Sequence, residues 1–227
     1  MEKRLQDVKR RIEKAAQASG RPPHSIRLVA VSKTIPAKKV IEAIDAGATL
    51  FGENYVQEAG AKFNELYEYH ASWHFIGHLQ SNKAKYAVRL FDLIHSVDSL
   101  KLSRELNKQA KKINKIQDVL IQVNMSGETS KSGIDPKDVA GLIKEISSLE
   151  NLAIKGLMTM PPFFNDPDTV RPYFSALRDL RDQLDRESPP NVTLAELSMG
   201  MTGDYEVAIA EGATLVRVGT AIFGKRK

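Results

Sequence analysis

The 227-residue chain contains no cysteine, and this absence removes several kinds of chemistry at once. Without thiols there is no disulfide framework, no thiolate nucleophile and no cysteine-ligated metal site. No run of apolar residues approaches the length that spans a bilayer, so we expect no transmembrane segment. Residues 1–16 are charged and lack the apolar core of a signal peptide. Together these absences favour a cytoplasmic protein.

The chain is also poor in aromatic residues, at 7%, although its net charge is +5. Its lysines and arginines are spread along helix-like segments instead of being gathered with aromatic residues in one patch. We therefore expect a solvated surface and no nucleic-acid partner. A basic site would still suit a small phosphorylated molecule. The hydrophobic share of 42% and the charged share of 27% are those of an ordinary globular protein, and residues 1–227 are predicted to form one domain.

Strand-like and helix-like segments alternate along the chain with a regular period. The predicted strands are 27–32, 49–52, 73–77, 93–97, 119–123, 153–158, 194–198 and 215–218. The predicted helices include 37–46, 55–69, 100–113, 136–149 and 170–184, with a further helix over 1–16 before the first strand. Such a pattern predicts an α/β protein, a single (β/α)8 TIM barrel with an extra N-terminal helix. An open doubly wound sheet is the alternative.

The first predicted strand ends in the sequence Val-Ser-Lys-Thr, which places Lys33 at its carboxyl end. In barrel proteins this end of the strands faces the active site. A lysine that leaves a buried strand is desolvated, and desolvation favours the neutral amine that forms Schiff bases. The alternative is a lysine that merely extends past the strand into solvent.

The last two predicted strands are both followed by residues suited to a phosphate group. Glycines at these positions let backbone N–H groups approach a dianion closely, and barrels often bind phosphate after their seventh and eighth strands. The candidates are Ser198, Gly200, Gly219 and Thr220. The alternative is that Gly200 and Gly203 only form a turn. The proline-rich segment from Pro161 to Pro167 follows another strand and is predicted to be a rim loop over the site.

Arg217 alternates with Val216 and Val218 in an apolar strand, so it would bring a permanent charge into the barrel. Together with the lysine and the phosphate cup, it suggests pyridoxal 5′-phosphate (PLP) as the ligand. The aldehyde would join Lys33, and Arg217 would face the pyridine nitrogen. His74 and His78 would share a strand face, but no carboxylate has ligand spacing to them, so we assign His74 to packing and expect no metal.

Seven segments together resemble the pyridoxal phosphate homeostasis protein family. They are residues 31–34 (VSKT), 51–58 (FGENYVQE), 73–83 (WHFIGHLQSNK), 130–133 (SKSG), 156–160 (GLMTM), 197–204 (LSMGMTGD) and 216–224 (VRVGTAIFG). The resemblance implies a fold similar to the N-terminal barrel of fold-type III PLP enzymes such as alanine racemase. It further implies the following roles: a Schiff base on Lys33, phosphate contacts from Ser198, Gly219 and Thr220, a pyridine contact from Arg217, and Asn54 beside the cofactor.

The resemblance also implies a function in vitamin B6 balance, because members of this family bind, store and hand over PLP without an established catalytic reaction. We therefore expect a monomeric PLP carrier that affects amino-acid balance, has apo PLP-dependent enzymes as recipients, and uses Lys131 to attract a second or transferring cofactor. A PLP-dependent racemase or decarboxylase is the first alternative. A cofactor-free Schiff-base aldolase is the second, although it would not need Arg217. Since the chain ends at Lys227, we expect no C-terminal domain that supplies the tyrosine of racemases, and hence poor turnover of amino acids.

Overall fold

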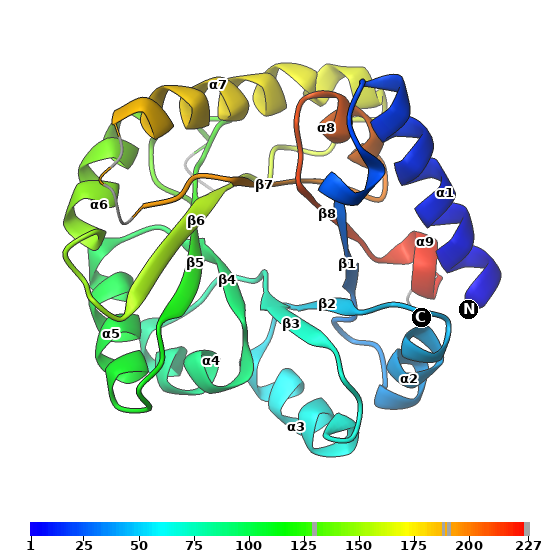
Figure 1. The fold of residues 1–227 in the computed structure, drawn as a ribbon, viewed down its shortest axis with the longest axis horizontal. Coiled ribbons are helices and arrows are strands. Elements are labelled where there is room, and N and C mark those ends of the chain that lie inside the picture. Colours follow the sequence, from blue (N-terminus) through cyan, green and yellow to red (C-terminus); the bar gives the residue numbers. More distant parts are fainter. Residues whose placement is uncertain (129–130, 188, 190–191, 225–227) are drawn as a thin grey trace.

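The computed structural model describes residues 1–128, 131–187, 189 and 192–224, which contain a closed ring of eight parallel strands (Figure 1). Neighbouring strands pair in chain order, and β8 pairs with β1 to close the ring. The strands are β1 (Arg27–Val31), β2 (Leu50–Glu53), β3 (Ser72–Phe75), β4 (Leu93–Val97), β5 (Gln117–Gln122), β6 (Leu152–Met158), β7 (Glu196–Met201) and β8 (Leu215–Val218). The pairing of β8 with β1 confirms the predicted barrel and excludes the open sheet.

Helices surround this ring on its outer side (Figure 1). They are α1 (Glu2–Ala18), α2 (Ala37–Asp45), α3 (Val56–Leu66), α4 (Ala84–Leu90), α5 (Leu100–Lys111), α6 (Val139–Ile146), α7 (Arg171–Glu187), α8 (Tyr205–Ala210) and α9 (Thr220–Phe223). Within the described residues, four short 3-10 helices accompany them at Pro23–Ser25, Ser81–Lys83, Pro136–Asp138 and Pro167–Val170. The predicted extra helix is α1, which buries Leu5, Val8 and Ile12 and packs against α8 and α9.

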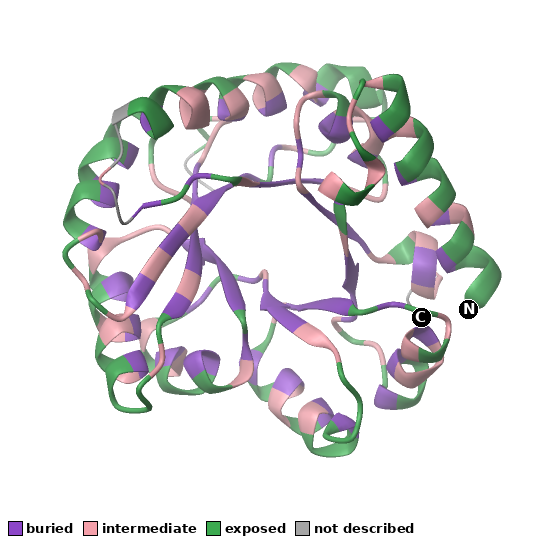
Figure 2. Cartoon of the chain, in the orientation of Figure 1, coloured by how far each residue is buried: buried purple, intermediate pink, exposed green. Residues whose placement is uncertain are grey.

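Apolar side chains form two layers, one inside the ring and one between the strands and the helices. The inner cluster contains Val29, Leu50, Leu93, Leu120, Met158 and Leu215. Side chains alternate between the two faces of a strand, so Ala30 belongs to the outer layer while its neighbour Val29 belongs to the inner one. Figure 2 shows this arrangement as mostly buried strands inside, surrounded by helices that carry most of the exposed residues.

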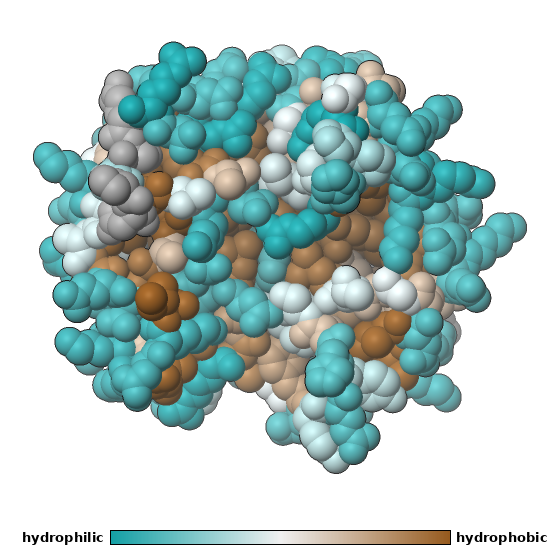
Figure 3. Space-filling model, viewed as in Figure 1, coloured by the Kyte–Doolittle hydropathy of each residue, from teal (hydrophilic) through white to brown (hydrophobic). Residues whose placement is uncertain are grey.

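Polar and apolar side chains are also separated on the surface of the molecule. In Figure 3 hydrophilic side chains cover the outer helices, and hydrophobic ones are visible mainly toward the middle of the face. None of the helices in the described part of the chain combines the length and the apolar character that crossing a lipid bilayer requires.

Strand β7 departs from its predicted position in a way that changes the site. It runs to Met201 instead of ending at Ser198, because a β-bulge shifts its register against β8 between these two residues. Gly200 within the bulge has a φ of +86°, and a Cβ there would lie 2.5 Å from the Ala208 Cβ. The glycine therefore allows α8 to approach β7 closely. As a result Ser198 lies inside the strand, and Thr202 is the first residue beyond it.

Candidate functional site

Lys33 lies where the sequence predicted it, in the turn that follows β1 at the carboxyl end of the barrel. The turn is closed by a hydrogen bond of 3.0 Å from the Ile35 N–H to the Ser32 carbonyl oxygen. Thr34 within it has a φ of +62°, which is rare for a β-branched residue. Lys33 is half-buried, while Thr34 is exposed.

The turn is contacted by a second lysine, Lys62 of α3, which the sequence analysis missed. Its ammonium group donates to Ser32 O at 2.5 Å, to Glu53 Oε1 at 2.7 Å and to Glu58 Oε1 at 2.7 Å. Glu53 is fully buried, and this burial raises the pKa of its carboxyl group, whereas the hydrogen bonds from Lys62 and Ser32 act in the opposite direction. The only sequence signal was the spacing of four between Glu58 and Lys62, which is typical of an exposed helical ion pair.

Arg217 of β8 lies inside the barrel, as predicted, and is 4% exposed. It donates hydrogen bonds of 2.5 Å to Ser198 Oγ and 2.9 Å to the Thr159 carbonyl oxygen. Among the described residues no carboxylate forms a hydrogen bond with it, and Asp204 acts on it only at longer range. Burial lowers the pKa of the guanidinium to about 10, so the group remains a cation at neutral pH.

Arg217 also determines the direction of a hydrogen-bonded chain across the barrel interior. A guanidinium has only donors, so Ser198 Oγ accepts from it and gives its own proton to His95 Nδ1, 2.9 Å away. His95 then carries its proton on Nε2 and donates it to His74 Nδ1, also at 2.9 Å. Burial lowers the pKa of His74 to about 3 and that of His95 well below its usual value, so both rings are neutral at pH 7.

This hydrogen-bonded arrangement corrects the interpretation of the two histidines that lie four positions apart, His74 and His78. Because β3 ends at Phe75, His74 lies in the barrel interior while His78 is exposed beyond the strand, so they do not share a face. The predicted packing role of His74 is confirmed, with a hydrogen bond to His95 added to it. The part of the chain that the structure describes contains no group of three side chains that would hold a metal ion.

The rim beyond β7 and β8 contains some of the residues predicted for phosphate. Thr220 is exposed at the start of α9, and the Gly219 N–H points to Thr202 Oγ1 at 3.3 Å. The predicted position of Ser198 at this rim is wrong, because β7 continues past it and its hydroxyl is fully buried against Arg217. Gly200 is likewise used for packing against α8. Thr202 was not predicted from the sequence, although it stands directly before a Gly-Asp pair.

The predicted rim loop, residues 161–167, lies at the same mouth. A Cβ placed on Gly203, just after β7, would be 3.8 Å from the Phe163 ring, so the loop lies over the end of that strand. Phe163 is 75% exposed, whereas Phe164 stacks on Tyr173 of α7. The position of the loop confirms the prediction.

Two cavities lie at the carboxyl ends of the strands. One, of about 460 Å³, is lined by residues after β2 and β3 that include Asn54 and His78. The other, of about 650 Å³, follows β5 and is lined by Asn124 and Lys131. Ser130, which begins the SKSG motif, lies outside the described residues.

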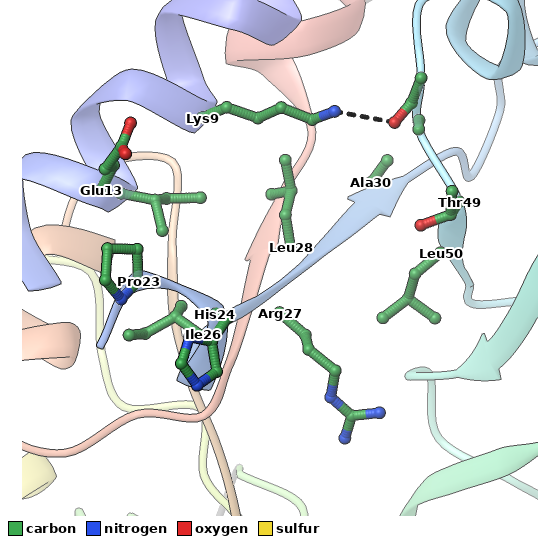
Figure 4. A pocket seen from close by; sticks show the side chains of 13 residues that line it. Lys9, Glu13, Pro23, His24, Ile26, Arg27, Leu28, Ala30, Thr49 and Leu50 are labelled. Carbon is green, nitrogen blue, oxygen red and sulfur yellow. Dashed lines mark hydrogen bonds between the residues drawn. The ribbon is translucent and has the colours of Figure 1, made fainter. Parts of the chain in front are cut away.

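A further cavity, of about 400 Å³, lies on the other side of β1 (Figure 4). Leu28 and Ala30 project from β1 toward α1 there, and Lys9 reaches across to the Gly47 carbonyl oxygen at 2.8 Å. These two residues have the opposite orientation to Val29, so the cavity is separated from the barrel interior by the strand itself. It is therefore not part of the site around Lys33.

Comparisons with known proteins agree on one family. The family of the alanine racemase N-terminal domain matches residues 4–227, in agreement with the predicted fold type. The pyridoxal phosphate homeostasis protein of Aquifex aeolicus is 47% identical over 99% of this chain and 97% of its own length. The protein of the same name from Escherichia coli is 43% identical over 98% of this chain and 95% of its own. The solved structure of PipY from Synechococcus elongatus with PLP bound is 40% identical, with a TM-score of 0.84 over 94% of this chain and 100% of that one.

Proposed function

Because this chain belongs to the pyridoxal phosphate homeostasis protein family, we propose that it binds PLP as a Schiff base on Lys33 and buffers or supplies it. The observation that carries the proposal is Arg217, a buried cation held by neutral partners inside the barrel, on the strand next to the one that leads to Lys33. Strands β1 and β8 are neighbours, with Val29 paired to Arg217. Lys33 follows the end of β1, and we propose that a pyridine ring bound between this turn and β8 contacts both side chains.

Other atoms of the described structure fit the same ligand. Arg217 uses two of its five N–H donors within the described residues, so donors remain for a ring nitrogen. Asn54 Oδ1 and Glu53 Oε2 are buried next to the mouth without a hydrogen-bond partner among these residues. Buried polar atoms of this kind need a partner, which a polar ligand would provide.

The phosphate group would bind at the rim made by the ends of β7 and β8. The first N–H groups of α9 have no partner within the helix, and the hydroxyl groups of Thr220 and Thr202 flank Gly219. We assign the phosphate to Gly219, Thr220 and Thr202. Ser198 contributes by holding Arg217, and Gly200 by shaping the strand end.

We also propose that the protein does not turn over amino acids. PLP supplies a carbonyl carbon for the Schiff base and a ring that withdraws electrons when its nitrogen is protonated. Arg217 remains a cation at neutral pH and only donates hydrogen bonds, so a ring nitrogen facing it stays unprotonated. The relatives from Aquifex aeolicus and Escherichia coli carry no enzyme activity in their names. A racemase of amino acids remains the second candidate, favoured by the match to the alanine racemase domain.

We further propose where the protein acts and how it exchanges the cofactor. The protein would act as a cytoplasmic monomer without nucleic acid, and apo PLP-dependent enzymes would receive the cofactor. Lys131 lines its own cavity after β5 and would attract a second or departing PLP there.

Borohydride reduction of the PLP-loaded protein followed by peptide mapping tests the main proposal. We expect the reduced cofactor on Lys33, and we expect Lys33→Ala to lose the Schiff-base absorbance while it stays folded. Lys101→Ala is the control, since it removes an exposed lysine of α5 that lines neither cavity at the carboxyl ends of the strands. Reduction onto a different lysine in the unaltered protein would refute the proposed attachment.

The absence of turnover has its own test, because Cα proton exchange is the signature of racemases. Loaded protein is incubated with L- and D-alanine in deuterated water, and the Cα proton signal is followed by NMR. We expect no exchange above that of free PLP. Exchange at ordinary enzyme rates that disappears in Lys33→Ala would favour the racemase.

A further inference from the structure

The turn that carries Lys33 is strained, and the strain is located one residue after the lysine. Thr34 has a φ of +62°, although β-branched side chains rarely adopt the left-handed conformation. Such a conformation persists only where surrounding contacts enforce it, and it is concentrated at functional sites. Since Thr34 is itself exposed, packing of its side chain does not enforce it.

Two side chains of α3 supply the missing contacts. Glu58 Oε1 accepts the Thr34 N–H at 2.5 Å, and Lys62 donates to the Ser32 carbonyl oxygen on the other side of Lys33. Lys62 gives its other two protons to Glu58 and Glu53, so all three donors of its ammonium group are used. The backbone on both sides of Lys33 is thereby tied to α3 and β2.

The burial of this cluster shows that it is more than a surface ion pair. Lys62 is 5% exposed and Glu53 is 0% exposed. Charged side chains are almost never buried this far unless they are paired, because the desolvation is expensive. A four-residue surface turn does not by itself require such an arrangement, and here it surrounds the residue proposed to bind the ligand.

We propose that Glu58 and Lys62 are positioning residues for Lys33, holding its turn in the one conformation that presents the amine to the aldehyde of PLP. This inference rests on the proposed function. Schiff-base formation would join the nitrogen of the neutral Lys33 amine to the aldehyde carbon by a double bond, and the two amine protons would leave with the carbonyl oxygen as one water molecule. No electrons are gained or lost.

The test compares two ligands that differ only in whether they can react with Lys33. PLP forms the Schiff base, whereas pyridoxamine 5′-phosphate has the same ring and phosphate but no aldehyde. We expect Glu58→Ala to raise the Kd for PLP and to slow Schiff-base formation by roughly ten-fold each, as for one charge-assisted hydrogen bond. The affinity for pyridoxamine 5′-phosphate should change by less than about two-fold, because the ring and phosphate contacts remain.

Four further variants separate positioning from other effects. Glu58→Gln keeps an acceptor oxygen for the Thr34 N–H and should retain most of the rate. Glu65→Ala removes a carboxylate from an exposed position of the same helix and should have no effect. Thr34→Gly makes the left-handed conformation favourable, so combining it with Glu58→Ala should restore most of the lost rate. Lys62→Met is informative only after its folding has been verified, because it leaves Glu53 buried without a counter-charge.

The results distinguish this inference from the proposed function. If the unaltered protein attaches PLP elsewhere, the proposed function fails; if Glu58→Ala binds PLP at the unaltered rate, or weakens both ligands equally, positioning fails. Amide hydrogen exchange of Thr34 and Ile35 in the ligand-free protein provides a readout without any cofactor. We expect faster exchange in Glu58→Ala and normal exchange in Glu65→Ala, and equal protection in both would overturn the inference.

Discussion

At the scale of single residues, the buried guanidinium of Arg217 dictates the proton positions of three neighbours. Because it has donors only, the Ser198 hydroxyl must donate onward, and His95 and His74 are held as the tautomers protonated on Nε2. Replacing it by lysine would keep the charge but lose the planar donor geometry. The chain of neutral acceptors is what lets a cation remain inside the barrel without a hydrogen-bonded carboxylate in the described part of the chain.

This arrangement predicts different effects for the two hydroxyl residues of the β7 segment. Thr202→Val should weaken binding of pyridoxamine 5′-phosphate about ten-fold, because it removes a hydroxyl that we propose as a donor to the phosphate. Ser198→Ala should leave that affinity nearly unchanged and should instead shift the absorbance of bound PLP, because Arg217 loses a partner. Fluorescence titration and absorbance spectra measure the two effects.

Thr193→Val serves as the control, since this exposed threonine precedes β7 at the other end of the barrel. A ten-fold loss in Ser198→Ala with no loss in Thr202→Val would return the phosphate to Ser198.

Some single residues could be predicted from the sequence and others could not, for a physical reason. Arg217 could be identified because a charged side chain between two valines of a strand must either face the barrel interior or pair with another group. Lys62 was not, because a glutamate and a lysine four residues apart are usually solvated, and only the tertiary packing of α3 against Glu53 buries this lysine. His95 was equally hidden within an apolar strand.

At the scale of elements, the end of β7 decides which residues reach the rim. The sequence predicted β4 and β8 with the bounds that the structure shows, since each begins and ends with an apolar residue and is flanked by polar residues or glycine. Strand β7 was predicted too early, because Met199, Gly200 and Met201 do not reveal that pairing continues through a bulge. Because of this error, Ser198 was predicted to lie at the rim and Thr202 was not predicted as a rim residue.

The bulge in β7 leads to a prediction about the free energy of unfolding. Gly200→Ala should destabilise the protein by roughly 2–4 kcal/mol, since alanine at a φ of +86° is strained and its Cβ would lie 2.5 Å from the Ala208 Cβ. Urea denaturation followed by circular dichroism gives the free energy of unfolding.

Gly203→Ala is a matched control three residues further on. A Cβ there would meet only the Phe163 ring, at 3.8 Å, which is ordinary contact. A loss of stability for Gly203→Ala equal to that for Gly200→Ala would show that the bulge is not the cause.

At the scale of the whole molecule, the barrel could be predicted because its signal is repeated. Errors of a few residues at each strand end do not alter the alternation of strands and helices, and the ring closes whichever residue begins a strand. The interior could not be predicted in the same way. Which polar side chains meet there depends on the relative heights of strands distant in sequence, such as β4, β7 and β8.

The polar interior makes the stability of the entire barrel depend on pH. Below a pH of about 6.5 the unfolded chain takes up protons on its histidines, whereas burial holds the pKa of His74 at about 3 in the folded chain. The unfolded state then binds more protons, so stability falls as the pH falls from 6.5 toward 3. Between pH 6.5 and 4.5 His74 alone should contribute a loss of about 2–3 kcal/mol, and His95 adds to it.

His74→Gln tests this directly, because the glutamine carbonyl can still accept the hydrogen bond from His95 but cannot take up a proton. The free energy of unfolding, measured in urea between pH 4.5 and 7, should fall less steeply with acidification in this variant. The difference between the two slopes should correspond to the uptake of about one proton on unfolding. His24→Gln exchanges an exposed histidine and controls for the loss of a histidine as such. An identical pH dependence in His74→Gln and the unaltered protein would mean that His74 is protonated in the folded barrel. The one-way hydrogen-bonded chain from Arg217 would then be wrong, since a doubly protonated ring has no acceptor for His95.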